Sequence, residues 1–261
     1  MERNFLEEYY NHYDEDGRLR SRHGQVEFLT TLRYVERYLT PDSRILEIGA
    51  GTGRYSHYLA QKGYTVDAVE LIAHNIDVFR EKTQPGERIT VRQGNALGLS
   101  FFADGTYDMT LLLGPMYHLY TVEEQKQALA EAVRVTKKGG IICVAYCGND
   151  ATIVQFCFKK GMLLQENYKK LVDPVTFKAA STPVELFQLY RKEDIDALTE
   201  GFDVERLHFV GTDMATNYMR DEVDAMSDEL YEKFLAYQFA ICERADMVGV
   251  SHHMLDVLRK R

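Results

Sequence analysis

Apolar positions recur with a helical period through the first part of the chain. Residues 2–13 and 24–39 each repeat an apolar side chain every three or four positions, which predicts two amphipathic helices. The turn residues of "DEDGR" separate the two helices, and "TPDS" ends the second. The residues on the two apolar faces are Phe5, Leu6, Tyr9, Tyr10, Tyr13, Phe28, Leu32, Val35 and Leu39.

From residue 44 the pattern changes to short apolar runs separated by helical segments. Strands are predicted at the start of "RILEIGAGTG" and in "YTVDAVEL", "ITVRQGNAL", "YDMTLLLG" and "IICVAYC". The helices between them are a stretch that ends at Gly63, residues 73–83 and residues 121–136. Thr121 and Glu124 form a capping box for the last of these helices, and Gly139-Gly140 end it. Five strands joined in this way predict a parallel sheet with right-handed crossovers.

The regular alternation stops after Asn149. Residues 150–190 contain two prolines and many large apolar side chains, and they are too long for a plain connection, so we expect a helical insertion above the sheet. A further helix and a sixth strand then follow, "RKEDIDALTEGF" and "DVERLHFVG". Residues 219–243 predict one long amphipathic helix, and "HHMLDVLRK" predicts a final edge strand.

Composition and charge narrow the classes of function. The formal net charge is −9 and the basic runs are short, whereas nucleic-acid binding requires a basic stripe that neutralises phosphates. No run is long enough to cross a bilayer, and the acidic, aromatic N-terminus differs from a signal peptide. The four cysteines form no CxxC pair and no zinc spacing, so we expect reduced thiols, no metal and a cytoplasmic location.

Three alternating glycines follow the first predicted strand, in "EIGAGTG". Gly49, Gly51 and Gly53 allow the backbone to turn sharply and to approach a ligand without a Cβ atom in the way. The dinucleotide fingerprint G-x-G-x-x-G needs a glycine where this chain has Arg54. The carboxylate of Glu47 repels a diphosphate but attracts a ligand that carries an ammonium group.

Polar residues also end the next two predicted strands. Glu70 follows the glycine turn by about twenty residues, which is the position of a carboxylate that accepts two ribose hydroxyls. Asn95 can pair with the amino edge of an adenine, and the small Ala96 leaves room for the ring. Because the carboxyl ends of parallel strands meet at one edge of the sheet, these groups predict a nucleoside site there.

Taken in order, these segments resemble the class I S-adenosylmethionine-dependent methyltransferases. "ILEIGAGTGRYS", "VDAVEL", "GNAL" and "LLLGPMYHLY" resemble the first four motifs of that family, and "VTKKGGIICVAY" resembles its fifth strand, so the likeness covers residues 44–147. The family commonly has Asp where this chain has Asn95, and an amide can still face adenine. The resemblance implies the cofactor S-adenosylmethionine, held by Glu47, Gly49, Ala50, Gly51, Gly53, Glu70, Leu71, Asn95, Ala96 and Leu113.

The resemblance also implies the fold and its division. We expect an α/β protein with a Rossmann-like, seven-stranded, mostly parallel sheet and helices on both faces. The expected parts are an N-terminal helical lid (1–40), a cofactor-binding core (41–149), a helical cap insertion after strand five (150–190), and the rest of the sheet with a long helix (191–261).

In this family the end of the fourth strand lies beside the reactive methyl group. Adenine DNA methyltransferases place a polar acceptor for the amino group there, and this chain has Gly114 instead, which disfavours methylation of a nucleobase amine. His118 is the candidate general base, or else it caps the next helix or packs under the lid. Tyr117 is expected in the pocket wall. By analogy Tyr13 is the lid residue that reaches the cofactor, although packing on the apolar face of a helix is the favoured interpretation for at least two of the lid tyrosines.

The leading hypothesis is methyl transfer to an oxygen or nitrogen atom of a small molecule. The apolar side chains of residues 150–190 suit a partly apolar small molecule, and they would equally suit a homodimer interface. Two alternatives remain open from the sequence: an RNA-modifying methyltransferase, which needs a basic face over the cleft, and a non-catalytic module that only binds the cofactor.

Overall fold

A central sheet has the strand order β3-β2-β1-β4-β5-β8-β7, with the short strand β6 paired beside β5. This computed structural model describes residues 5–13 and 17–261. The strands are β1 (Arg44–Ile48), β2 (Thr65–Glu70), β3 (Ile89–Gln93), β4 (Tyr107–Leu112), β5 (Thr136–Gly148), β6 (Leu189–Tyr190), β7 (Val204–Gly211) and β8 (His253–Lys260). Strands β1 to β5 pair in parallel, and β8 is antiparallel to both β5 and β7. The Rossmann-like, mostly parallel sheet that the sequence predicts is confirmed.

Helices connect the parallel strands and cover the sheet. They are α3 (Arg54–Gln61), α4 (Ala73–Lys82), α5 (Val122–Val135) and α8 (Lys192–Thr199). The strand order reverses at β1, so right-handed crossovers place α3 and α4 on one face and α5 on the other. The reversal also leaves a crevice between the carboxyl ends of β1 and β4, where open α/β sheets bind ligands.

Residues 121–140 and 219–243 are divided differently from the sequence prediction. The capping box of Thr121 and Glu124 is present, but α5 ends at Val135 because Thr136 already begins β5; Gly139-Gly140 lie within that strand and do not end the helix. The segment expected to be one long helix is two helices, α9 (Arg220–Asp224) and α10 (Asp228–Ile241). They are separated because the side chain of Ser227 caps α10 by accepting a hydrogen bond from the Leu230 N–H group.

Strand β8 lies inside the sheet and not at its edge, which corrects the sequence prediction. Five successive residues from Met254 to Leu258 are buried, as expected for a strand covered on both faces. Asp256 interrupts the apolar run in the sequence, so the sequence does not indicate a strand buried on both faces. Its carboxylate is fully buried and accepts hydrogen bonds from Nε and Nη2 of Arg206 on β7, both at 2.7 Å.

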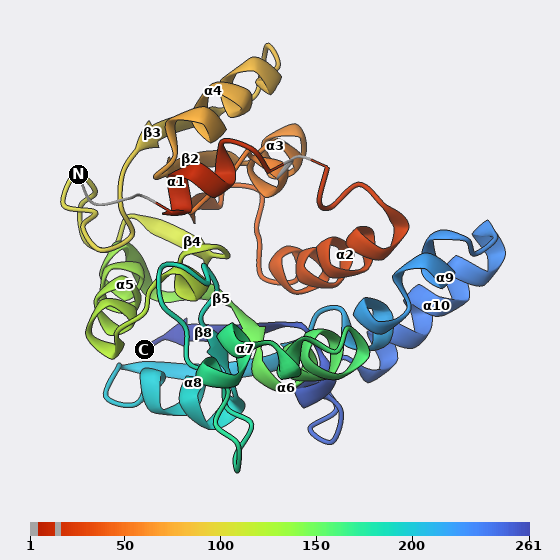
Figure 1. Cartoon of the computed structure of the whole chain (residues 1–261). Helices are drawn as coiled ribbons and strands as arrows, with labels where there is room; N and C mark the ends of the chain where they lie inside the picture. The colour runs from red at the N-terminus through yellow and green to blue at the C-terminus, as the bar shows by residue number, and fades with distance from the viewer. Residues whose placement is uncertain (1–4, 14–16) are drawn as a thin grey trace.

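Two segments lie outside the alternating core. The first contains α1 (Phe5–Tyr10) and α2 (Arg22–Glu36), and α2 packs against α9 and α10 (Figure 1). The second follows β5 and consists of α6 (Asn149–Thr152), a π-helical turn (Ile153–Lys159), a 3-10 turn (Met162–Leu164) and α7 (Glu166–Leu171). No helix in the described part of the chain is long and apolar enough to cross a membrane.

Candidate active site

The glycine turn between β1 and α3 has a backbone that only glycine adopts easily. The φ angles of Gly49, Gly51 and Gly53 are +74°, +54° and +86°. The N–H groups of Gly49 and Ala50 both donate to the carbonyl oxygen of Val69, at 2.8 and 3.1 Å, so β2 fixes the turn from the side. At its three glycines the turn therefore presents backbone without a Cβ atom at the carboxyl edge of the sheet.

The same turn packs tightly against the end of β4. A Cβ atom on Gly49 would lie 2.6 Å from Cδ of Pro115, and one on Gly114 would lie 3.1 Å from the carbonyl oxygen of Gly49. Both distances are shorter than an ordinary van der Waals contact of about 3.5 Å. Close packing on the turn therefore explains why residue 114 is a glycine. The sequence alone indicated only that Gly114 offers no side-chain acceptor for an amine.

Glu70 is buried beneath the turn at the end of β2. Its Oε2 accepts a hydrogen bond from the N–H group of Gly51 at 2.8 Å, and its Oε1 accepts one from Ile72 at 2.9 Å. Burial raises the pKa of Glu70, and the hydrogen bonds lower it by a smaller amount, so the pKa is above its usual value. A carboxylate has about four acceptor positions, so Glu70 can shape the turn and still accept hydroxyl donors from a ligand.

Glu47 is the second buried acid of the turn, and its side chain accepts a hydrogen bond from Ser56 Oγ. Burial, with the nearby charge of Glu70, raises the pKa of Glu47 to about 8. Among the described residues, no cationic side chain forms an ion pair with Glu47. A positively charged ligand group at this position would favour the ionised carboxylate.

The remaining predicted cofactor residues lie along the ends of β2, β3 and β4. The side chain of Asn95 is exposed, and its Oδ1 accepts a hydrogen bond from the N–H group of Leu97 at 3.0 Å. That bond closes a local turn and leaves the amide NH₂ group of Asn95 to face a ligand. Leu71 is 42% exposed, whereas Ala96 is buried. Leu113 is partly buried and packs against the main core.

The sequence of this core matches a known family. The family model described as a methyltransferase domain matches residues 46–144, which contain the glycine turn, Glu70 and the end of β4. This chain contains a methyltransferase domain.

Two curated relatives each match less than half of this chain. A demethylmenaquinone methyltransferase of Renibacterium salmoninarum is 35% identical over 105 residues, or 40% of this chain and 41% of the relative. An S-adenosyl-L-methionine-dependent Diels-Alderase, iccD of Talaromyces variabilis, is 31% identical over 106 residues, or 39% of this chain and 35% of the relative. The match thus spans well under half the length of these two proteins.

Solved structures share the fold over nearly the whole chain. The PH0226 protein of Pyrococcus horikoshii has a TM-score of 0.60 at 16% identity, covering 97% of this chain and 99% of its own. A Thermotoga maritima protein, described as an S-adenosylmethionine-dependent methyltransferase and possible histamine N-methyltransferase, has a TM-score of 0.58 at 18% identity, covering 98% of both chains. The segments outside the methyltransferase domain therefore belong to the same overall architecture.

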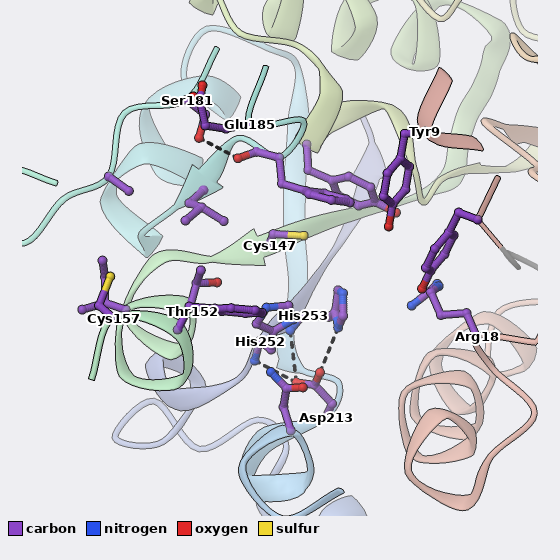
Figure 2. Close-up of a pocket in the computed structure, with 18 of the residues that line it drawn as sticks. Tyr9, Arg18, Cys147, Thr152, Cys157, Ser181, Glu185, Asp213, His252 and His253 are labelled. Carbon is purple, nitrogen blue, oxygen red and sulfur yellow. Dashed lines mark hydrogen bonds and ion pairs between the residues drawn. The ribbon is translucent and has the colours of Figure 1, made fainter. Parts of the chain in front are cut away.

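A cavity of about 830 Å³ lies beside the methyltransferase domain, under the segments that flank it (Figure 2). Its walls come from α1 and α2, from the end of β4, from the segment after β5, and from the C-terminal residues around Asp213 and His252. This volume is within the range of small-molecule sites in proteins, about 300–1,000 Å³.

One wall of the cavity is aromatic. Tyr9 and Tyr13 stack with ring centroids 4.9 Å apart, and Tyr9 also meets Phe187 edge to face at 6.0 Å. Tyr117 lies 5.9 Å from Phe187, and its hydroxyl donates to the carbonyl oxygen of Leu113 at 2.9 Å. Tyr13 and Tyr117 thus both line the cavity, and their chemical roles stay predictions from the sequence.

His118 lies behind this wall and is not one of the residues that line the cavity. Its Nδ1 is 2.8 Å from the carbonyl oxygen of Leu186, which can only accept, so Nδ1 carries the proton. Nε2 then accepts the hydrogen bond from the Tyr10 hydroxyl at 2.9 Å. Burial lowers the pKa of His118 to about 4. This arrangement supports a positioning role for His118 over that of a general base.

The opposite part of the cavity is charged, and sequence reasoning missed it. Asp213, His252 and His253 lie together there, while Tyr9 and Arg18 belong to the N-terminal side of the cavity (Figure 2). Burial alone would lower the pKa of His253, but Glu27 and Asp213 raise it well above the usual range. The only sequence signal was the pair "HH" at the start of β8, which does not indicate the distant carboxylates.

Proposed function

We propose that this chain is an S-adenosylmethionine-dependent methyltransferase that transfers a methyl group to an oxygen or nitrogen atom of a small molecule. The observation that carries the proposal is the position of the cavity. The cavity is lined by Tyr117, which lies in the 3-10 turn that follows β4. The same turn begins at Pro115, which packs on Gly49 of the glycine turn. A nucleoside bound at the glycine turn and an acceptor in this cavity would therefore share one edge of the sheet.

The residues of the turn suit the cofactor chemically. The buried Glu47 has no cationic partner among the described residues, and the ammonium group of a methionine moiety would supply one. Glu70 keeps acceptor positions for ribose hydroxyls, and the exposed amide of Asn95 can face adenine. The sulfonium group supplies an already activated methyl, so the protein has to position the acceptor and exclude water.

The aromatic wall supports a positioning role for the N-terminal segment. The Tyr10 hydroxyl donates a hydrogen bond to Nε2 of His118. This bond connects α1 to the 3-10 turn (Pro115–His118) that follows β4. Tyr9, Tyr13 and Tyr117 then enclose the side of the cavity next to that turn. We infer that a docked α1 shields the acceptor from water while the methyl group is transferred.

The first experiment measures cofactor binding by calorimetry with S-adenosylhomocysteine. We expect one bound molecule per chain, and we expect Gly51→Val to abolish binding because a side chain would fill the approach to the turn. Gly249→Val is the matched control, since a Cβ atom there meets nothing within 4 Å. The absence of binding at millimolar concentration would contradict the proposal.

The second experiment identifies the acceptor. Metabolite pools are incubated with the full chain and S-adenosylmethionine labelled in its methyl group, and mass spectrometry reports which compound gains the label. Wild-type protein should label at least one small molecule that the Gly51→Val variant does not label. If cofactor binds but no compound gains a methyl group from any pool, methyl transfer is the wrong activity.

A further inference from the structure

Four ionisable side chains from three separate parts of the chain meet at the charged end of the cavity. Glu27 comes from α2, Asp213 follows β7, and His252 and His253 lie at the start of β8. One ligand-type atom from each of Asp213, His252 and His253 lies within 4.8 Å of the other two (Figure 2). The methyltransferase chemistry proposed above uses none of these residues.

Too many acceptors converge on one imidazole nitrogen. The Nδ1 atom of His253 lies 2.8 Å from Asp213 Oδ2 and 3.3 Å from Glu27 Oε2. A ring nitrogen carries at most one proton, so it cannot make two good hydrogen bonds to two carboxylates. A metal ion, in contrast, is contacted by several carboxylate and imidazole atoms at once.

The neighbouring imidazole has an unpaired nitrogen. Nδ1 of His252 is shielded from solvent and has no hydrogen-bond partner among the described residues. Leaving such a group unpaired in the interior destabilises the folded state. An unprotonated imidazole nitrogen is also a metal ligand, which binds at about 2.0–2.1 Å.

We propose that Asp213, His252 and His253 bind a divalent transition-metal ion at this end of the cavity. Two imidazoles and one carboxylate suit Zn²⁺ or Fe²⁺ better than Mg²⁺ or Ca²⁺, which prefer sets of oxygen ligands. The ion takes the place of the one proton that lies between His253 and the two carboxylates. Three protein ligands leave at least one coordination position for a ligand in the cavity.

The surrounding hydrogen bonds hold the carboxylate in a ligating orientation. Oδ1 of Asp213 accepts from Ser251 Oγ at 2.7 Å and from the N–H groups of His252 and His253 at 2.8 and 3.1 Å. Oδ2 is thereby directed to the imidazoles. Supporting contacts of this kind commonly orient metal ligands in proteins.

The side chains around the proposed ion offset only part of its charge. Glu27 Oε2 also pairs with Arg18 at 2.8 Å, which makes Glu27 a neighbouring counter-charge and not one of the three ligands. The carboxylates of Glu27 and Asp213 oppose the charge of a divalent ion, and Arg18 offsets part of theirs. An acceptor oxygen that becomes anionic as it loses its proton would complete the balance, and this last step rests on the proposed methyltransferase function.

The test measures metal binding without any cofactor. Tag-free full-length chain is treated with a chelator, desalted, and titrated with Zn²⁺ and with Co²⁺ by calorimetry and absorption spectroscopy. We expect one ion per chain for the wild type, and affinity at least about tenfold weaker for His252→Ala. Nδ1 of His252 has no hydrogen-bond partner among the described residues that its removal would leave unpaired, so this variant should fold, and circular dichroism checks that it does.

His23→Ala is the matched control, because His23 also lines the cavity but pairs with Asp224 and lies outside the cluster. It should bind one ion with wild-type affinity. Asp213→Asn, which keeps the Oδ1 acceptor, should weaken binding as His252→Ala does. The inference is overturned if no ion binds at one per chain, if His252→Ala binds like the wild type, or if the Co²⁺ spectrum shows thiolate ligation. Calorimetry with S-adenosylhomocysteine on the same samples tests the proposed function separately.

Discussion

Glu47 shows how one residue can connect cofactor binding to proton release. Its carboxyl group is buried, and burial raises its pKa to about 8, so it is mostly protonated at pH 7 when no ligand is bound. A ligand ammonium group favours the charged form. Binding at neutral pH should therefore expel a proton from Glu47, and affinity should rise as the pH increases from 6 to 8.

This release can be measured by calorimetry in buffers with different ionisation enthalpies. We expect the observed enthalpy of S-adenosylhomocysteine binding at pH 7 to differ between phosphate and Tris by an amount that corresponds to a fraction of a proton. Glu47→Gln should bind more weakly and show no such difference. Equal enthalpies for the wild type in both buffers would mean that Glu47 does not change its protonation.

His118 should make the folded state sensitive to acid. Its pKa in the folded chain is about 4, below the usual value of 6.5. Between these two pH values the unfolded chain binds a proton that the folded chain does not, so the free energy of unfolding falls as the pH is lowered through this window.

The His118→Asn variant should lose part of this dependence. Urea unfolding at pH 7 and pH 5 would show a smaller decrease in stability for the variant than for the wild type. His74→Asn, on the exposed surface of α4, is the control and should behave like the wild type. If both variants lose stability equally on acidification, another group causes the effect.

At the scale of elements, the glycine turn and the end of β4 act as one packed unit. Gly49 requires a left-handed backbone and the absence of a Cβ atom, whereas Gly63 at the end of α3 requires only the backbone. Comparing alanine substitutions at these two glycines separates the free-energy cost of the left-handed backbone from the cost of the steric collision.

Gly49→Ala should therefore destabilise the chain more than Gly63→Ala. In both variants the left-handed alanine should lower the free energy of unfolding by about 1–2 kcal/mol. Gly49→Ala should lose about 1–3 kcal/mol more, because its Cβ atom would collide with Pro115. Urea unfolding measures the difference, and equal losses would show that Pro115 moves aside without cost.

Elements that depend on near neighbours in the sequence were predictable, and those that depend on distant ones were not. The turn after β1 and the capping box of Thr121 are each specified by a few consecutive residues. The charged cluster is different, because Glu27 and His253 approach within 3.3 Å although more than two hundred positions separate them. No local pattern marks such a pair. His118 is an intermediate case, since its position was predicted but its partners Tyr10 and Leu186 were not.

At the scale of the whole molecule, the two ends of the described chain contribute differently to the fold. Strand β8 hydrogen-bonds to both β5 and β7, and its Asp256 pairs with Arg206 inside the sheet. The N-terminal helix α1 contributes no buried residue. Stability should therefore depend on the C-terminal strand far more than on α1.

Two truncations test this difference. Removal of residues 253–261 should leave no cooperative thermal unfolding transition, because β7 loses its only partner among the described strands. Removal of residues 1–13 should preserve the transition, and S-adenosylhomocysteine should still bind. A cooperative transition in the chain that lacks residues 253–261 would show that the sheet closes without β8.

The interior position of β8 also has a consequence for how the protein is made. The ribosome synthesises β1 to β5 first, and each strand from β2 to β5 can pair with one that has already emerged. Strand β7 emerges after the short strand β6, but its partner is β8, which is translated later still. Until residues 253–260 have been added, the nascent chain exposes the open side of β5 and an unpaired β7, and it depends on chaperones or rapid completion to avoid aggregation.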